Sequence, residues 1–109
     1  MGTLKYANVD AAIEIDDDIL AHLRAVTVTK LRRNESFALT IPLSGDTSET
    51  FWIHPSIPIQ FVITEDIALH RPLLAEMMDA SNSALGLDLT KPRFAAPLDR
   101  SRTMHAMSA

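Results

Sequence analysis

The residues best suited to metal chemistry are Asp18 and His22, which stand four positions apart in a stretch with helical periodicity. This spacing places both side chains on one helix face, where Asp16 or Asp17 could complete a small metal site. Acidic residues are also common at the start of a helix, because they interact favourably with its dipole. No second histidine lies within range along the sequence. We therefore favour a capped helix start, and we predict no metal site and no cofactor.

The sequence contains the side chains of a hydrolytic triad without the backbone motifs that activate one. His54 and Asp46 are accompanied by three serines, Ser44, Ser48 and Ser56. No Gly-x-Ser-x-Gly nucleophile elbow and no Gly-rich phosphate loop is present, and the chain has only three glycines. The sequence therefore favours a non-catalytic role and supplies no catalytic residue, although it leaves enzymatic activity open.

Two groups of basic residues could contact phosphate. The first group lies in the second half of a predicted helix and consists of Arg24, Lys30, Arg32 and Arg33. The second group lies near the C-terminus and consists of Lys91, Arg93, Arg100 and Arg102. Because the C-terminal end of a helix attracts cations and disfavours anions, we interpret the first group as compensating the helix dipole. The second is interpreted as a solubilising tail, with nucleic-acid binding as the alternative for both groups.

A tryptophan and a histidine stand in a predicted strand where alternation turns both away from the core. If Phe51 and Ile53 face inward, Trp52 and His54 face outward, and they could share the outer face of a sheet with Gln60 and Val62. Tryptophan is favoured at the centres of protein interfaces, so these four residues are a candidate partner-binding site. The alternative is that a helix covers this face, which would make Trp52 a core residue.

The totals are typical of one folded domain. The chain has 109 residues, a net charge of −4 and no cysteine. The charge is uneven, because residues 91–109 carry +3 and residues 1–90 carry −7. We see no apolar run of the ~20 residues that a membrane span requires, and we expect a cytoplasmic protein without membrane contact.

Periodicity predicts the order strand, strand, helix, strand, strand, strand, helix, strand. The central prediction is a long amphipathic helix from Asp16, as N-cap, to Arg33, with Asn34 as its C-terminal stop. A shorter helix begins at Pro72 and ends at Gly86. The predicted strands are 3–7, 12–15, 36–43, 50–54, 57–63 and 87–89. We predict a two-layer α+β domain over 1–90 with a mostly antiparallel sheet, in which the three middle strands lie together, and a flexible basic tail over 91–109.

Several separated blocks match a known family in order. They are Tyr6, Ile13-Glu14-Ile15-Asp16-Asp17, Ala21-His22-Leu23, Lys30-Leu31-Arg32-Arg33-Asn34-Glu35-Ser36-Phe37 and Trp52-Ile53-His54-Pro55-Ser56-Ile57-Pro58. The chain resembles small proteins of unknown function from actinobacteria and actinobacterial phages, many of which carry the automatic label "ATP-dependent DNA ligase". The resemblance covers residues 3 to about 90. A ligase needs a nucleophilic lysine in a Lys-x-Asp-Gly context, and none of Lys5, Lys30 and Lys91 has it. The resemblance therefore carries over no catalytic residue.

Taken together, these observations favour a small non-catalytic interaction or accessory module that acts through protein contacts. The partner is another protein or a second copy of the chain, since exposed edge strands invite pairing. A nucleic-acid-associated accessory protein is the alternative, and its binding should weaken steeply with salt.

Overall fold

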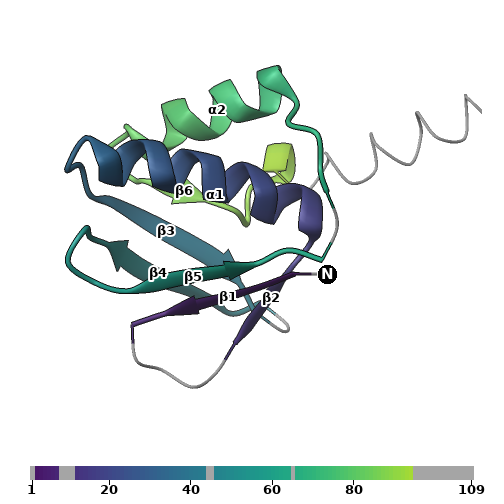
Figure 1. The fold of residues 1–109 in the computed structure, drawn as a ribbon, viewed down its shortest axis with the longest axis horizontal. Helices are drawn as coiled ribbons and strands as arrows, with labels where there is room; N and C mark the ends of the chain where they lie inside the picture. The colour runs from purple at the N-terminus through teal and green to yellow at the C-terminus, as the bar shows by residue number, and fades with distance from the viewer. Residues whose placement is uncertain (1, 8–11, 44–45, 65, 95–109) are drawn as a thin grey trace, which may run out of the picture.

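The computed structural model describes residues 2–7, 12–43, 46–64 and 66–94 of the chain. The elements in order are β1 (Gly2–Tyr6), β2 (Ile13–Ile15), α1 (Asp17–Arg32), β3 (Phe37–Pro42), β4 (Ser48–Ile53), β5 (Ile59–Val62), α2 (Arg71–Ser81) and β6 (Leu87–Asp88). The predicted α+β class, the order of elements and the one long and one shorter helix are confirmed. Figure 1 shows the two helices together on one side of the strands.

The long helix begins and ends where its sequence predicts. Asp16 is the N-cap, and its side chain accepts a hydrogen bond from the Asp18 backbone N–H at 3.2 Å. The helix ends at Arg32, and Asn34 takes a positive φ of 60° beyond it. An asparagine tolerates this left-handed conformation better than most residues, so it suits a helix end.

The strands form two three-stranded sheets, and the prediction that the three middle strands lie together is wrong. The orders are β2-β1-β5 and β4-β3-β6, and among the strands of the described residues only β3 and β6 pair in parallel. The connection after β4 contains Pro55 and Pro58, which lack the N–H that a ladder needs. The Ala7 N–H donates to the Pro58 carbonyl at 2.8 Å, so the chain continues beside β1 instead of returning along β4.

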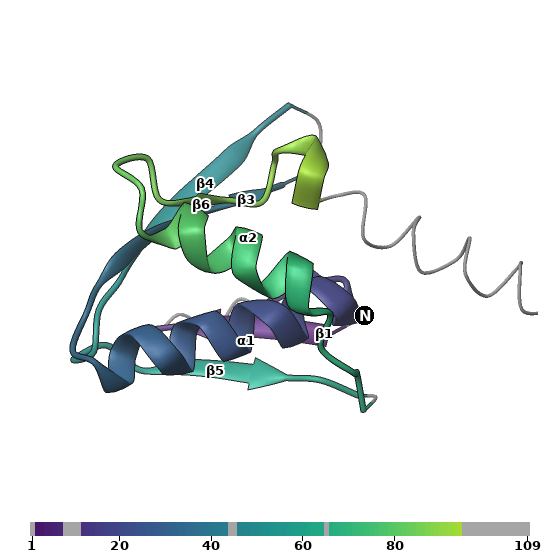
Figure 2. The same ribbon diagram turned by 90° about the horizontal axis from the view of Figure 1, so that it is seen from above.

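The helices form one layer over both sheets. Viewed from above, α1 lies nearer β1 and β5, whereas α2 lies nearer β3, β4 and β6 (Figure 2). The buried side of α1 includes Leu20, Leu23 and Val26, each with no exposed surface. The amphipathic stripe therefore packs where the sequence places it, and α2 packs alongside α1.

The second helix is shorter than predicted. It ends at Ser81 with Asn82 as C-cap, and Leu85, which lies within the predicted helix, is 82% exposed. The Ser81 hydroxyl donates to the Met78 carbonyl and the Ser83 hydroxyl to the Ala80 carbonyl, both at 2.7 Å. Such side-chain bonds compete with helix continuation, which explains the early end.

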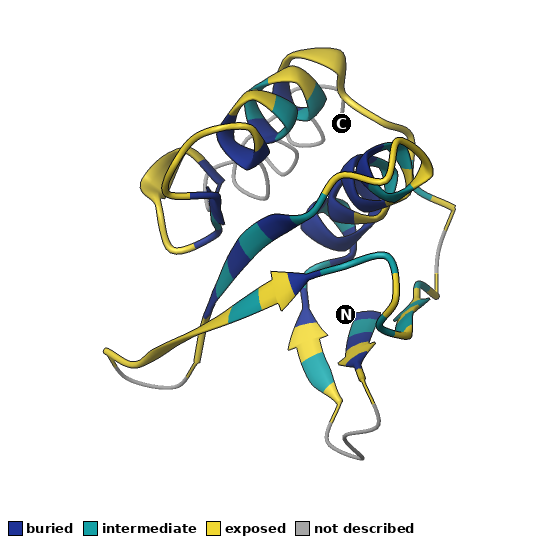
Figure 3. Ribbon diagram, turned by 90° about the vertical axis from the view of Figure 1, so that its left-hand side faces the viewer, coloured by how far each residue is buried: buried dark blue, intermediate teal, exposed yellow. Residues whose placement is uncertain are grey.

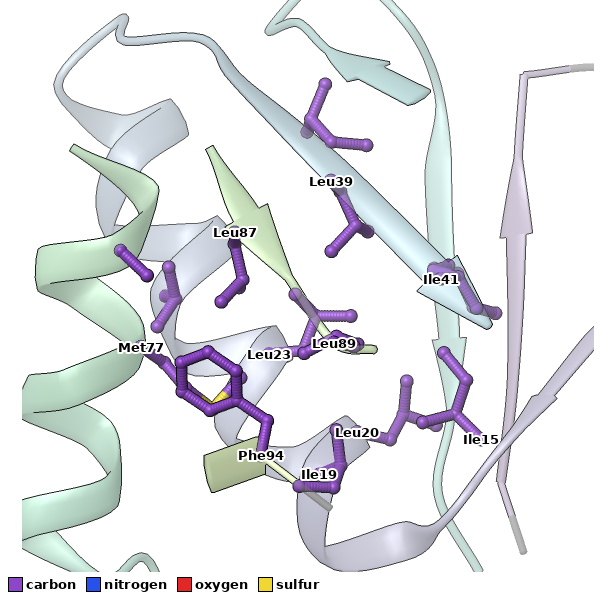
Figure 4. Close-up of a cluster of buried hydrophobic side chains, with 14 of the residues drawn as sticks. Ile15, Ile19, Leu20, Leu23, Leu39, Ile41, Met77, Leu87, Leu89 and Phe94 are labelled. Atoms are coloured by element: carbon purple, nitrogen blue, oxygen red, sulfur yellow. The ribbon is translucent and has the colours of Figure 1, made fainter. Parts of the chain in front are cut away.

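The hydrophobic core reaches beyond the predicted domain boundary at residue 90. Phe94 is 1% exposed and belongs to the same cluster as Ile19, Met77 and Leu89 (Figure 4). The folded part therefore includes residues to at least Phe94, within a short helical turn over 92–94. The predicted tail from residue 95 onward lies outside the described residues.

Candidate functional site

Trp52 lies on the outer side of an edge strand. β4 pairs with β3 on one side, and its other edge has no strand partner in the described part of the chain. The Trp52 side chain is 59% exposed, while its neighbour Ile53 is fully buried. Figure 3 shows most of β4 as exposed, beside the alternately buried β3. The predicted alternation is confirmed for this strand, and Trp52 is a surface residue.

The indole of Trp52 lines a surface hollow of about 510 Å³. Its walls come from the last turn of α1, the start of β3 and the segment that follows α2. They include Lys30, Glu35, Phe37, Ala38, Ser81, Asn82, Ser83, Ala84 and Gly86. A hollow of this size can hold a small molecule or a peptide side chain. We call this hollow, Trp52 and the free edge of β4 the Trp52 surface.

The other three residues predicted to bind a partner do not share a sheet face with Trp52. His54 follows β4 and is partly buried, and its Nδ1 accepts a hydrogen bond from the Ser56 N–H at 3.0 Å. Gln60 and Val62 are exposed on β5, which belongs to the other sheet. The expected common face is therefore wrong, because strand pairing separates β4 from β5.

Tyr6 connects the strand that carries Trp52 to the other sheet. Its phenol donates to the backbone carbonyl of Trp52, and its ring meets the Phe51 ring edge to face at 5.7 Å between centroids. Burial raises the pKa of the Tyr6 phenol above its ordinary value. The backbone of β4 at Trp52 is therefore held by a partly buried hydrogen bond, and the neighbouring Phe51 by an aromatic contact.

The first basic group does not act as one cluster. Arg24, Arg32 and Arg33 are exposed on or next to α1, and the last two line a surface hollow of about 370 Å³. Lys30 is only 4% exposed and pairs with Glu35 and Asn82. Sequence periodicity could not reveal this burial, because the partners come from two other segments.

The second basic group is only partly described. Lys91 and Arg93 are exposed, and the Arg93 guanidinium lies 4.7 Å from the centroid of the Phe94 ring. Arg100 and Arg102 lie outside the described residues. Lys91 and Arg93 come after the short strand β6, far along the chain from the basic residues of α1.

His22 has a structural partner at each ring nitrogen. The ring is 2% exposed, its Nδ1 lies 2.6 Å from the Asp18 carbonyl oxygen, and its Nε2 accepts a hydrogen bond from the His70 N–H at 2.8 Å. Within the described ranges no group of three His, Cys, Asp or Glu side chains is placed to hold a metal ion. The same ranges contain no helix that is both long and apolar enough to cross a membrane.

A family model identifies the class of protein without giving a function. The model of a domain of unknown function, DUF7882, matches residues 1–92. The chain therefore belongs to the DUF7882 family. No curated protein and no solved structure matches it.

Proposed function

We propose that this chain is a small, non-catalytic, cytoplasmic module that binds another protein through the Trp52 surface. The observation that carries the proposal is the 59% exposure of Trp52 on the free edge of β4. A large aromatic side chain left open beside a hollow is typical of interface hot spots, where tryptophan is enriched. Tyr6 occupies the Trp52 carbonyl, but the rest of this edge has no strand partner in the described residues, so a partner strand could pair there.

The backbone position of Trp52 supports the same proposal. The hydrogen bond from Tyr6 fixes the carbonyl of Trp52, and the paired residue Ala38 on β3 fixes the other side of the strand. An anchor that is already ordered loses less conformational entropy on binding. The partner could also be a second copy of this chain, bound through the same edge of β4.

The test is capture of partners from native lysate by the full-length chain, with nuclease present and absent. Trp52→Ala should abolish capture, because it removes the anchor. Leu69→Ala is the matched control, since Leu69 is also exposed, at 46%. It lies in the connection between β5 and α2, at the opposite end of the molecule from the end of β4 (Figure 1).

Both variants should keep a free energy of unfolding within about 1 kcal/mol of the parent, because both side chains are largely exposed. Circular dichroism and urea unfolding check this before capture is compared. A nuclease-resistant partner that Trp52→Ala still binds as the parent does would contradict the proposal. Sedimentation of the parent and Trp52→Ala tests self-association in the same samples.

Nucleic-acid association is the second candidate. The exposed positions of Arg24, Arg32 and Arg33 on or next to α1 favour it, together with Lys91 and Arg93. Lys30 weakens it, because its charge is buried and paired. Nuclease-sensitive capture that also falls steeply with salt would favour this candidate over the first.

A further inference from the structure

The hollow beside Trp52 combines an apolar wall with a buried cation. Trp52 and Ala38, which are paired across β4 and β3, supply the sheet side, and the segment after α2 closes the opposite side. Lys30 reaches the hollow from the last turn of α1, although its side chain is almost fully buried. A ligand that occupies this volume would therefore meet an aromatic surface and an ammonium group together.

The ammonium of Lys30 can donate one hydrogen bond more than its partners among the described residues accept. It donates to Asn82 Oδ1 at 2.5 Å and lies 3.2 Å from Glu35 Oε1. An ammonium group can donate three hydrogen bonds, and these are its two partners among the described residues. A buried ammonium group is costly unless it is paired and hydrogen-bonded. The hollow therefore favours a ligand with an oxygen that accepts a hydrogen bond from Lys30.

Glu35 is the partner that a ligand could replace. Its side chain is 45% exposed, so its carboxylate can turn into water without leaving a buried charge of its own. A ligand carboxylate would then keep Lys30 neutralised through a charge-assisted hydrogen bond.

The remaining polar groups of the hollow also favour an acceptor ligand. Asn82 accepts from Lys30 through Oδ1, which leaves its amide N–H groups available as donors. The hydroxyls of Ser81 and Ser83 already donate to the carbonyls of Met78 and Ala80. Lys30 and Asn82 therefore keep donors that a ligand could use.

We propose that this hollow binds a carboxylate of a peptide segment, with Lys30 as its counter-ion and an adjacent aliphatic side chain against Trp52. This inference rests on the proposed function, because it names the chemistry of the partner that the Trp52 surface would bind. The carboxylate belongs to an acidic side chain or to a chain end, and the experiment separates these sources.

Trp52 is the only tryptophan in the chain, so its fluorescence reports directly on the hollow. The full chain is titrated with N-acetyl-leucine, which carries a terminal carboxylate, and with N-acetyl-leucinamide, which carries none. A third probe, N-acetyl-aspartyl-leucinamide, carries its carboxylate on a side chain. At least one acid should give a saturable change with half-saturation in the millimolar range, which is usual for so small a ligand. The affinity for the neutral amide should be at least about ten-fold lower than the affinity for the acid.

Two substitutions should change the affinity in opposite directions. Lys30→Met keeps the apolar stem but removes the charge, so acid binding should fall about ten-fold or more. Glu35→Gln removes the competing carboxylate, so acid binding should become several-fold tighter. Circular dichroism checks the fold of both, and if Lys30→Met does not fold, the direction of the Glu35→Gln effect decides.

Three results would overturn the inference: no saturable signal with either acid, equal affinity for the neutral amide, or weaker acid binding by Glu35→Gln. None of them depends on the capture experiment. If capture depends on Trp52 while the titrations fail, the interaction module stands and its ligand is not a carboxylate. If the titrations succeed while capture fails, the chain has a carboxylate site that does not serve a stable protein partner.

Discussion

Gly86 is the residue whose identity the fold constrains most clearly. It has a φ of +77°, in the region that side chains with a Cβ rarely adopt. A Cβ built at this position would lie 2.5 Å from the backbone oxygen of Ala38 and 2.7 Å from its Cβ. The turn after α2 therefore lies directly against β3. The same turn forms one wall of the hollow beside Trp52.

Gly86→Ala should lower the free energy of unfolding by about 2 to 4 kcal/mol, from backbone strain and a forced shift against β3. Urea unfolding followed by circular dichroism measures it. Ala84→Ser in the same exposed turn is the control and should change stability by less than about 0.5 kcal/mol. A Gly86→Ala protein as stable as that control would show that the turn can move away from β3.

Between elements, His22 links the start of α2 to the first half of α1. Because the Asp18 oxygen is an acceptor, Nδ1 carries the ring proton and Nε2 accepts from the His70 N–H. This second bond satisfies a backbone donor at the N-cap of α2, which has no side-chain cap. A residue whose spacing could indicate a metal ligand thus has a structural role.

His22→Leu should lower the free energy of unfolding by about 2 kcal/mol, because the His70 N–H loses its acceptor. His70→Ala is the matched control, since it keeps the backbone N–H and removes only an exposed side chain. It should stay within about 0.5 kcal/mol of the parent. Equal stability of the two variants in urea unfolding would argue that the hydrogen bond contributes little.

The whole molecule depends on how its two sheets are joined. The Tyr6 phenol lies on β1 in one sheet and donates to the Trp52 carbonyl in the other. Its raised pKa means that the folded state favours the neutral phenol. The corresponding stability is fully present below the ordinary tyrosine pKa of 10.0 and is lost as pH rises through the folded value.

Tyr6→Phe should cost about 1 kcal/mol at neutral pH, because it removes one hydrogen bond and keeps the ring against Phe51. The parent should also lose more stability than the variant between pH 9 and pH 11, because an exposed tyrosine in the unfolded chain titrates at about pH 10. Urea midpoints across that range measure both effects. If the urea midpoints of the parent and the variant fall equally as pH rises, the Tyr6 phenol does not couple the sheets.

Local signals were sufficient to predict the helices and most strands. The Asp16 cap, the acidic first turn and the stop at Asn34 define α1, because each acts within a few residues. Alternation also placed Trp52 outside and Ile53 inside. These features depend on neighbours in sequence, so one chain reveals them.

The pairing of strands and the burial of single polar residues could not be predicted in this way. β5 pairs with β1, and Lys30 meets Asn82, across more than fifty positions in each case. Phe94 looked like part of a tail, because nothing nearby in the sequence indicates the core that it enters. Such contacts depend on which loops close during folding, and a period of two or 3.6 contains no information about that.

The central position of β1 has a consequence for the order in which the chain can fold. β1 is formed from Gly2–Tyr6, yet one of its two neighbours, β5, is Ile59–Val62. During synthesis the strand must remain without that neighbour until the ribosome has released residues up to Val62. Pairing over so long a separation closes a large loop, which slows folding compared with local contacts. The β1–β2 hairpin and α1 therefore form the first unit able to assemble, and closure of β5 onto β1 completes its sheet.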